Sequence, residues 1–181
     1  MNLALIFAGG TGTRMNSKTK PKQFLELNGK PIIIHTIELF ESHPEIDAIA
    51  VVCLESWIGY LNELLERFRI KKVKYVVPGG ETGQQSIRNG LTAFWDDQDI
   101  PRDSLVLIHD GVRPLINEDI ITRSIECAKQ YGNAITVTPA IETIITVSED
   151  DSVDQIMDRS KCRMARAPQT FRLCDIVEAH N

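Results

Sequence analysis

Five short apolar runs, rich in β-branched residues and separated by segments of helical length, constrain the fold of this chain most strongly. The runs occupy residues 3–8, 48–54, 73–77, 105–109 and 134–138. Strands that alternate with helices form a parallel sheet covered on both faces, because each helix returns the chain to the same edge of the sheet. The sequence therefore predicts an α/β fold, a three-layer α/β/α sandwich with a mostly parallel sheet. Ligands bind such folds beyond the carboxyl ends of the strands.

The segments between these runs carry apolar stripes at helical spacing. One helix should begin near Pro31 and end before Pro44, and the next should span about 57–68. Two further helices should cover about 84–94 and 118–131. We expect a single domain over residues 1–181, because a chain of this length with 43% hydrophobic residues can bury one sizeable core.

After Pro139 the pattern changes to that of a protruding β-hairpin, with strands at 143–147 and 153–157 around an acidic turn. This segment has too few apolar residues for a core of its own, and an isolated hairpin is only marginally stable in water. We therefore expect the hairpin arm, about residues 140–162, to pack on the sheet or on another subunit. Residues 174–181 have the pattern of a helix that is beginning.

Composition argues against several partners and compartments. The formal net charge is −5, whereas binding to nucleic acid or to an anionic membrane requires a basic face. The first apolar run is too short to cross a bilayer and lacks the basic start of a signal peptide. The cysteines at 53, 127, 162 and 174 are widely spaced and form no zinc-type pair. The sequence thus predicts a reduced, cytoplasmic protein that binds neither nucleic acid nor membrane.

A glycine-rich loop directly after the first predicted strand is the first candidate site. It reads AGGTGTR at residues 8–14, and glycines let successive backbone N–H groups approach phosphate oxygens. The dinucleotide fingerprint would need glycine where Met15 stands, and a Walker loop would need Gly-Lys-Ser/Thr. Arg14 and Lys22 can neutralise a triphosphate and its transition-state charge, whereas the other lysines of this basic segment are expected to be solvated. The alternative interpretation is a plain tight turn.

Two further strand ends carry polar residues. In HDGVRP, at residues 109–114, Asp110 can hold a magnesium ion that bridges phosphate oxygens, and Arg113 can pair with a phosphate. The alternative is an aspartate that caps a turn and pairs with the arginine. GGETGQQS, at residues 79–86, offers donors and acceptors for base and ribose recognition, although a helix N-cap at Thr82 explains the same residues.

Taken together, these segments resemble the family of 2-C-methyl-D-erythritol 4-phosphate cytidylyltransferase and ribitol-5-phosphate cytidylyltransferase. The motifs follow one another over essentially the whole chain as AGGTGTRM, PKQFLELNGKPIIIHTI, SIRNGL, HDGVRP, MDR and APQTF. The resemblance implies a Rossmann-like fold of the nucleotide-diphospho-sugar transferase type, CTP as the donor, and Mg²⁺ or another divalent cation. It also implies a homodimer in which the hairpin arm reaches the partner's active site, and a place in isoprenoid, cell-wall or capsule biosynthesis.

Carried over by position, the resemblance implies a role for each candidate residue. Arg14 and Lys22 would be catalytic, with Lys22 stabilising charge at the α-phosphate, and Asp110 would sit at the metal. The residues that would bind CTP are Ala8, Gly9, Gly10, Gly12, Thr13, Gly80, Glu81 and Ser86. Arg113, together with Arg159 of the partner subunit, would hold the acceptor's phosphate.

Three departures from the family pattern affect the predicted site. Gly83 replaces the arginine that is usual in the loop after the third strand. Ala167 replaces the threonine expected before Pro168, so that one hydrogen bond to the acceptor's phosphate is either missing or supplied by Thr170. Family members also continue beyond Asn181, through a Thr-Asp segment and a lysine-bearing strand that complete the site. We therefore expect that the C-terminal part of the domain is missing from this chain.

The resulting hypothesis is an in-line displacement in which a phosphate oxygen of the acceptor attacks the α-phosphorus of CTP and pyrophosphate leaves. The acceptor is a polyol phosphate, either ribitol 5-phosphate or 2-C-methyl-D-erythritol 4-phosphate. A tryptophan at position 57 resembles the family members that act on ribitol phosphate, but a tryptophan at the start of a helix is also typical of a hydrophobic core. Two alternatives stay open: a sugar-phosphate nucleotidyltransferase that uses another nucleoside triphosphate, and a non-catalytic nucleotide-binding domain. A dehydrogenase is disfavoured, because the third glycine of its fingerprint is missing.

Overall fold

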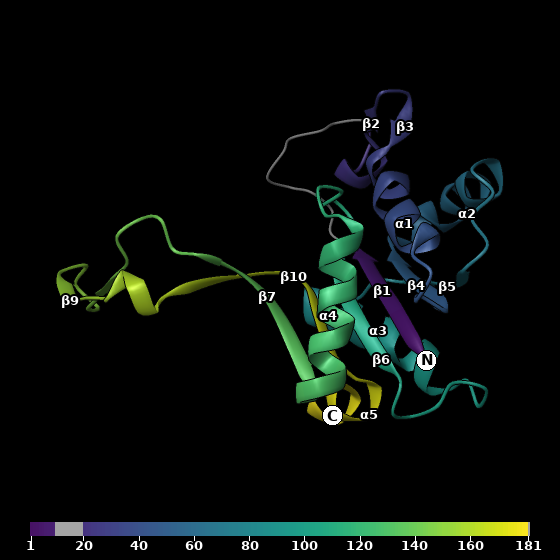
Figure 1. Ribbon diagram of the computed structural model, residues 1–181. Helices are drawn as coiled ribbons and strands as arrows, with labels where there is room; N and C mark the ends of the chain where they lie inside the picture. Colours follow the sequence, from purple (N-terminus) through teal and green to yellow (C-terminus); the bar gives the residue numbers. More distant parts are fainter. Residues whose placement is uncertain (10–19, 181) are drawn as a thin grey trace.

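A mixed six-stranded sheet forms the centre of the computed structural model, which describes residues 1–9 and 20–180 (Figure 1). The strand order is β5-β4-β1-β6-β10-β7. The strands are β1 (Asn2–Ala8), β4 (Ala48–Cys53), β5 (Val73–Pro78), β6 (Leu105–Asp110), β7 (Asn133–Pro139) and β10 (Arg163–Arg172). The first four of these are parallel to one another, and β10 is antiparallel to both of its neighbours. The expectation of a mostly parallel sheet is confirmed.

Helices cover both faces of this sheet, as expected. They are α1 (Ile32–Ser42), α2 (Ile58–Arg67), α3 (Gly83–Trp95), α4 (Glu118–Tyr131) and α5 (Leu173–Ala179). Ala4 and Ile6 of β1 belong to the core under α1, α2 and α4, whereas Leu3 and Leu5 belong to the core under α3 and α5. The three-layer α/β/α architecture is therefore confirmed. None of the helices in the described part of the chain is long and apolar enough to span a bilayer.

Local side-chain chemistry sets the boundaries of α3 and α4. The Thr82 hydroxyl accepts a hydrogen bond from the Gln85 backbone N–H, and the Gln85 side chain bonds back to the backbone of the cap, which completes a capping box. Asn117 caps α4 by accepting from the Ile120 N–H at 3.0 Å. Gly132 ends α4 in the left-handed region at φ 91°, a conformation that glycine adopts without a steric penalty.

A small hairpin precedes α1 and was not predicted from the sequence. Its strands are β2 (Glu26–Leu27) and β3 (Lys30–Pro31), and they follow the short 3-10 helix η2 (Lys22–Phe24). The two turn residues, Asn28 and Gly29, have positive φ values of 54° and 74°. Such a turn favours Asn-Gly, so the dipeptide itself was the signal for this hairpin.

Strand β10 is the main departure from the sequence-based expectation. The sequence analysis predicts no strand at residues 167–171, but these residues lie in a strand that separates β6 from β7. Residues 169–172 pair with β6, and the register with β7 shifts between Ala165 and Gln169. Pro168 lies inside this irregularity, where its missing N–H takes no bond from the ladder.

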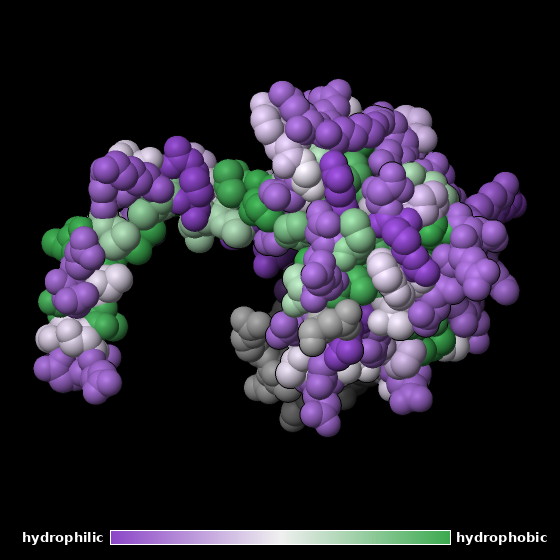
Figure 2. Space-filling view, turned by 90° about the horizontal axis from the view of Figure 1, so that it is seen from below, coloured by the Kyte–Doolittle hydropathy of each residue, from purple (hydrophilic) through white to green (hydrophobic). Residues whose placement is uncertain are grey.

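The hairpin arm is present, but it does not pack on the sheet. Its strands are β8 (Ile145–Val147) and β9 (Val153–Ile156), and every residue of both strands is exposed. Figure 1 shows the arm extending away from the main sheet, and Figure 2 shows apolar patches along its curved surface. Of the two expectations for the arm, contact with the sheet is therefore wrong, and contact with another subunit stays a prediction.

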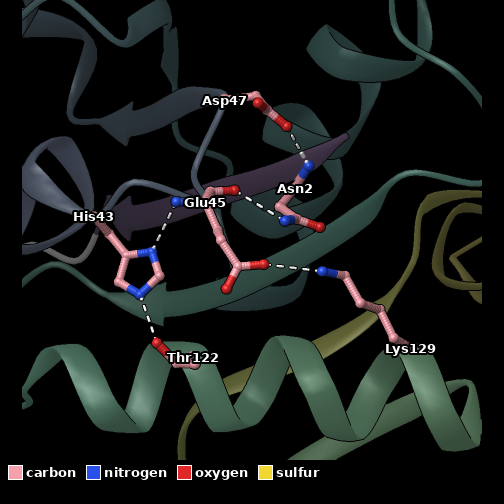
Figure 3. Close-up of polar contacts among 6 residues, drawn as sticks. All are labelled: Asn2, His43, Glu45, Asp47, Thr122 and Lys129. Atoms are coloured by element: carbon pink, nitrogen blue, oxygen red, sulfur yellow. Dashed lines mark hydrogen bonds and ion pairs between the residues drawn. The ribbon is translucent and has the colours of Figure 1, made fainter.

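Polar contacts hold the amino-terminal edge of the sheet together (Figure 3). His43 Nδ1 accepts from the Glu45 N–H at 3.2 Å, so that Nε2 carries the proton and donates to the Thr122 hydroxyl at 3.0 Å. The Lys129 ammonium pairs with the Glu45 carboxylate at 2.9 Å, and Asn2 Nδ2 donates to the Glu45 carbonyl at 2.9 Å. These bonds join the loop before β4 to α4, and they lie at the opposite end of the strands from the candidate site.

Candidate functional site

The loops after β1, β5 and β6 meet at the carboxyl edge of the sheet. A Cβ atom on Gly79 would lie 3.1 Å from the Gly9 Cα, and one on Gly9 would lie 3.0 Å from the Ser86 Oγ. A Cβ atom on Gly111 would lie 2.9 Å from the Ala8 Cβ. Chains that approach this closely leave no room for a side chain, so glycine is required. Three segments far apart in the sequence thus form one continuous surface.

The segment after β5 is shaped by the N-cap of α3. Ser86 is buried, and its hydroxyl accepts from the Gly80 N–H at 3.1 Å and donates to the Thr82 carbonyl at 2.9 Å. The Gln85 side-chain oxygen accepts from the Glu81 N–H at 2.8 Å. The N-cap interpretation of these residues is therefore confirmed. The predicted contacts of Gly80, Glu81 and Ser86 with CTP stay predictions, and the Ser86 hydroxyl joins the loop after β5 to the first turn of α3.

The central part of the predicted phosphate loop lies outside the described residues. This applies to the predicted CTP-binding residues Gly10, Gly12 and Thr13 and to the predicted catalytic Arg14. Their roles stay predictions. Ala8, which is buried at the end of β1, and the adjacent Gly9 mark where this loop leaves the sheet.

Lys22 belongs to the 3-10 helix η2 (Lys22–Phe24), called the platform below, which is fixed to the end of β1. Its neighbour Gln23 is 2% exposed and donates its side-chain N–H to the Ala8 carbonyl at 2.7 Å. Phe24 is fully buried and stacks on Trp57, with ring centroids 4.8 Å apart and ring planes at 19°. Buried contacts on the next two residues therefore hold the backbone of the half-exposed Lys22 beside the carboxyl edge. Trp57 packs against the core, as the second interpretation of this residue expected.

Asp110 caps the turn after β6 and pairs with Arg113. One carboxylate oxygen accepts from the Val112 N–H at 3.1 Å, and the other lies 3.0 Å from the Arg113 Nε. The turn-capping alternative is thus present, and the side chain of Asp110 is still 24% exposed.

His109 is fully buried, and burial lowers its pKa. The neutral imidazole can then donate from Nε2 to the Arg113 carbonyl, 3.0 Å away, which closes the turn.

A divalent cation fits Asp110 only if substrate oxygens complete its coordination. Across residues 1–9 and 20–180, no three His, Cys, Asp or Glu side chains gather where they could hold a metal ion. Mg²⁺ prefers oxygen ligands and is commonly bound by few carboxylates together with the phosphates of a substrate. The partly exposed Asp110 carboxylate at a strand end matches that donor set.

A cavity of about 410 Å³ opens beside the Asp110 turn, between the loop after β6, the start of α4, β7 and β10. Its lining residues are Val112, Arg113, Pro114, Leu115, Ile116, Ile120, Thr136, Thr138, Arg166 and Ala167. The cavity therefore brings together Arg113 and Ala167, two of the positions that the sequence analysis linked to the acceptor's phosphate. Arg159 lies elsewhere, in the 3-10 helix η4 (Arg159–Lys161) of the arm, where it donates to the Ile141 carbonyl at 2.9 Å.

Thr170 is not brought to this cavity. It is fully buried in β10, opposite Leu107 of β6, and its hydroxyl has no hydrogen-bond partner within the described part of the chain. The hydroxyl that Ala167 lacks is therefore not replaced by Thr170. Sequence analysis missed Gln23 and Arg166. The signal for Gln23 was its position beside Lys22, and Arg166 had no signal until β10 was recognised.

Comparisons with known proteins address the family and the fold of the chain. Residues 2–181 match the family model described as IspD: 2-C-methyl-D-erythritol 4-phosphate cytidylyltransferase. A ribitol-5-phosphate cytidylyltransferase of Vibrio parahaemolyticus is 58% identical over 180 residues, which are 99% of this chain and 75% of that protein. A 2-C-methyl-D-erythritol 4-phosphate cytidylyltransferase of Clostridium acetobutylicum is 40% identical over 181 residues, covering 99% of this chain and 76% of that protein. The crystal structure of 4-diphosphocytidyl-2C-methyl-D-erythritol synthase from Anaerococcus prevotii superposes with a TM-score of 0.83 at 27% identity, over 98% of this chain and 72% of that one.

Proposed function

The chain belongs to the IspD family of cytidylyltransferases, and on that premise we propose that it transfers the cytidylyl group of CTP to a polyol phosphate, with release of pyrophosphate. The proposed acceptor is ribitol 5-phosphate. Relatives named for that acceptor range from 36% to 58% identical, and those at 58% and 52% exceed the 40% and 36% of relatives named for 2-C-methyl-D-erythritol 4-phosphate. This difference in identity supports ribitol 5-phosphate as the preferred acceptor.

One observation carries the proposal: closely packed glycine backbone and two basic residues lie at the carboxyl edge of the sheet. Gln23 and Phe24 hold the backbone of Lys22 there, and Arg113 lines a cavity beside the turn after β6. The reaction must bring two negatively charged substrates together, so its main requirements are positioning and charge stabilisation. A CTP phosphate chain beside Gly9 and an acceptor phosphate beside Arg113 would meet these requirements.

The proposed reaction needs no protein nucleophile, because the acceptor is already an anion. A phosphate oxygen of the acceptor forms a bond to the α-phosphorus of CTP, and the bond from that phosphorus to pyrophosphate breaks. Lys22 stabilises the charge that develops at the α-phosphate, and Arg113 holds the acceptor's phosphate in line. Asp110 would hold a divalent cation, proposed to be Mg²⁺, which neutralises phosphate charge when bound.

The proposed assembly is a homodimer formed through the hairpin arm. Val153 and Ile156 of β9 are 60% and 68% exposed, and Ile145 of β8 is 45% exposed, which is unfavourable for a free hairpin in water. A second copy that covers these side chains would bring Arg159 of the partner subunit toward the cavity. Sedimentation should show a dimer for the native chain, a monomer for V153D/I156D, and a dimer for the control D154N. A native monomer would reject this assembly.

Pyrophosphate release tests the proposed function. The rate is measured with CTP, UTP, GTP and ATP in turn, each with ribitol 5-phosphate and with 2-C-methyl-D-erythritol 4-phosphate. CTP with ribitol 5-phosphate should give the highest kcat/KM. Absence of release from CTP with either acceptor, in a protein that binds CTP in calorimetry, would favour the non-catalytic alternative. Faster release from another nucleotide with a sugar phosphate would favour the other transferase alternative.

A further inference from the structure

Arg166 lies beside the position at which this chain lacks the expected hydroxyl. It precedes Ala167 on β10, and both residues line the cavity of about 410 Å³ that also contains Arg113. The size of this cavity falls within the range of small-molecule sites, roughly 300–1,000 Å³. Two arginines, one from β10 and one from the loop after β6, therefore line the same cavity.

The guanidinium of Arg166 keeps most of its hydrogen-bonding capacity. Its Nε lies 3.4 Å from the Thr138 hydroxyl, and its Nη2 lies 3.7 Å from the Met164 sulfur. Both contacts are long, and a thioether is a weak acceptor. No carboxylate of the described residues forms an ion pair with Arg166, whereas the Arg113 Nε is paired with Asp110 at 3.0 Å. A side chain that is always charged and has several unused donors is suited to an anionic ligand.

Of the other polar side chains nearby, Thr138 also lines the cavity, and its hydroxyl, which accepts from the Arg166 Nε at 3.4 Å, keeps its own proton for a ligand, whereas Thr136 does not. The Thr136 hydroxyl lies 2.7 Å from the Pro168 carbonyl, to which it donates its only proton. Ala167 contributes a methyl group, and Thr170 is fully buried. The cavity thus has a cation without an acidic partner at the place where relatives are expected to have a neutral donor.

We propose that Arg166 is an acceptor-binding residue, which donates to the phosphate of the polyol phosphate from the side opposite Arg113. The inference rests on the proposed function and deepens it by adding a second cation within the same chain to the acceptor site. A guanidinium can donate two parallel hydrogen bonds to a phosphate, so it selects a terminal phosphate dianion over the uncharged polyol. Ribitol without phosphate should therefore not compete for the site.

Steady-state kinetics of R166Q, R166K and R163Q test this assignment. Arg163 is the matched control, because it lies on the same strand outside the cavity and its Nη1 donates to the carbonyls of Ser160 and Cys162 at 2.8 and 2.9 Å. R166Q should raise the KM for ribitol 5-phosphate about tenfold to a hundredfold, which is the range for a lost charge-assisted hydrogen bond, with the KM for CTP unchanged. R166K keeps the charge but loses the two parallel donors of the guanidinium, so its KM for ribitol 5-phosphate should be intermediate. R163Q should have the same KM as the native chain.

The outcomes separate the inference from the proposed function. Equal acceptor KM values in R166Q and R163Q, with an active native chain, would overturn the role of Arg166 and leave the proposed function standing. A full-length protein that releases no pyrophosphate would refute the proposed function and this inference with it. A smaller sedimenting mass for R166Q with an unchanged acceptor KM would assign Arg166 to a subunit interface and also overturn the inference. Thermal unfolding of each variant shows whether it is folded.

Discussion

A methyl group at Gly9 tests whether the loops after β1 and β5 must touch for the site to form. In G9A the new Cβ would lie 3.0 Å from the Ser86 Oγ and 3.3 Å from the Gly79 Cα, both closer than ordinary contact. Overpacking of this kind costs about 1–3 kcal/mol. Two hydrogen bonds fix Ser86, and the other neighbour is backbone, so neither moves easily. We expect a loss of about 2 kcal/mol in the free energy of unfolding and a higher KM for CTP.

A double-mutant cycle isolates this contact. S86A alone removes two hydrogen bonds and should cost about 1–3 kcal/mol. In G9A/S86A the closest atom to the new methyl group is gone, and the next contacts lie at 3.3 and 3.6 Å. The double variant should therefore lose at least about 0.5 kcal/mol less than the sum of the single variants.

Urea unfolding of the four proteins gives these energies. G59A is the control, because a Cβ on Gly59 meets nothing within 4 Å. It should leave the free energy of unfolding unchanged or raise it by roughly 0.5–1 kcal/mol, since alanine favours the helix. Strict additivity of G9A and S86A, or a G9A protein as stable as G59A, would refute the claimed contact between the loops.

Three further predictions address the platform, its cation and the turn after β6. K22A should lower kcat by about 10²–10³-fold while changing the free energy of unfolding by no more than about 0.5 kcal/mol; an equal loss in the exposed control K71A would contradict the role of Lys22. F24A should lower the free energy of unfolding by about 3–5 kcal/mol, because it removes a fully buried ring stacked on Trp57; a loss below about 1 kcal/mol would show that the platform is not packed as described. Burial lowers the pKa of His109 below 6.5, so its contribution to the free energy of unfolding is present above pH 6.5 and is lost as the pH falls further. As the pH is lowered, the urea midpoint should therefore decline more steeply for the native chain than for H109Q, and parallel curves would contradict this.

The fold was predictable wherever the sequence pattern and burial agree. The strands that became β1, β4 and β6 are buried over nearly their whole length, so each is a continuous apolar run. The predicted bounds of α4 agree with the structure because Glu118 follows an N-cap and Tyr131 precedes a glycine. β10 was missed because its first half is exposed and lacks a continuous apolar run, and because Pro168 interrupts it, which is typical of a turn.

The part of the candidate site that lies directly after the carboxyl ends of the parallel strands was predictable from the sequence. The carboxyl ends of parallel strands share one edge, which placed Ala8, Gly80 and Asp110 together before their contacts were known. The burial of Thr170 and the exposure of Arg166 into the cavity depend on the register of β10, which no local pattern in the sequence specifies. The attachment of Lys22 depends on Gln23, whose hydrogen bond to β1 is a tertiary contact.

A crystal structure of the chain with CTP tests the central claim most directly. The account predicts the triphosphate at the carboxyl edge of the sheet, beside Gly9 and within reach of Lys22, with the Arg113 cavity next to the α-phosphate. Nucleotide bound instead in the groove between α1 and the end of α2, which Leu39 and Phe68 line, would contradict the account. So would CTP at the predicted edge with the Lys22 side chain directed away from its phosphates.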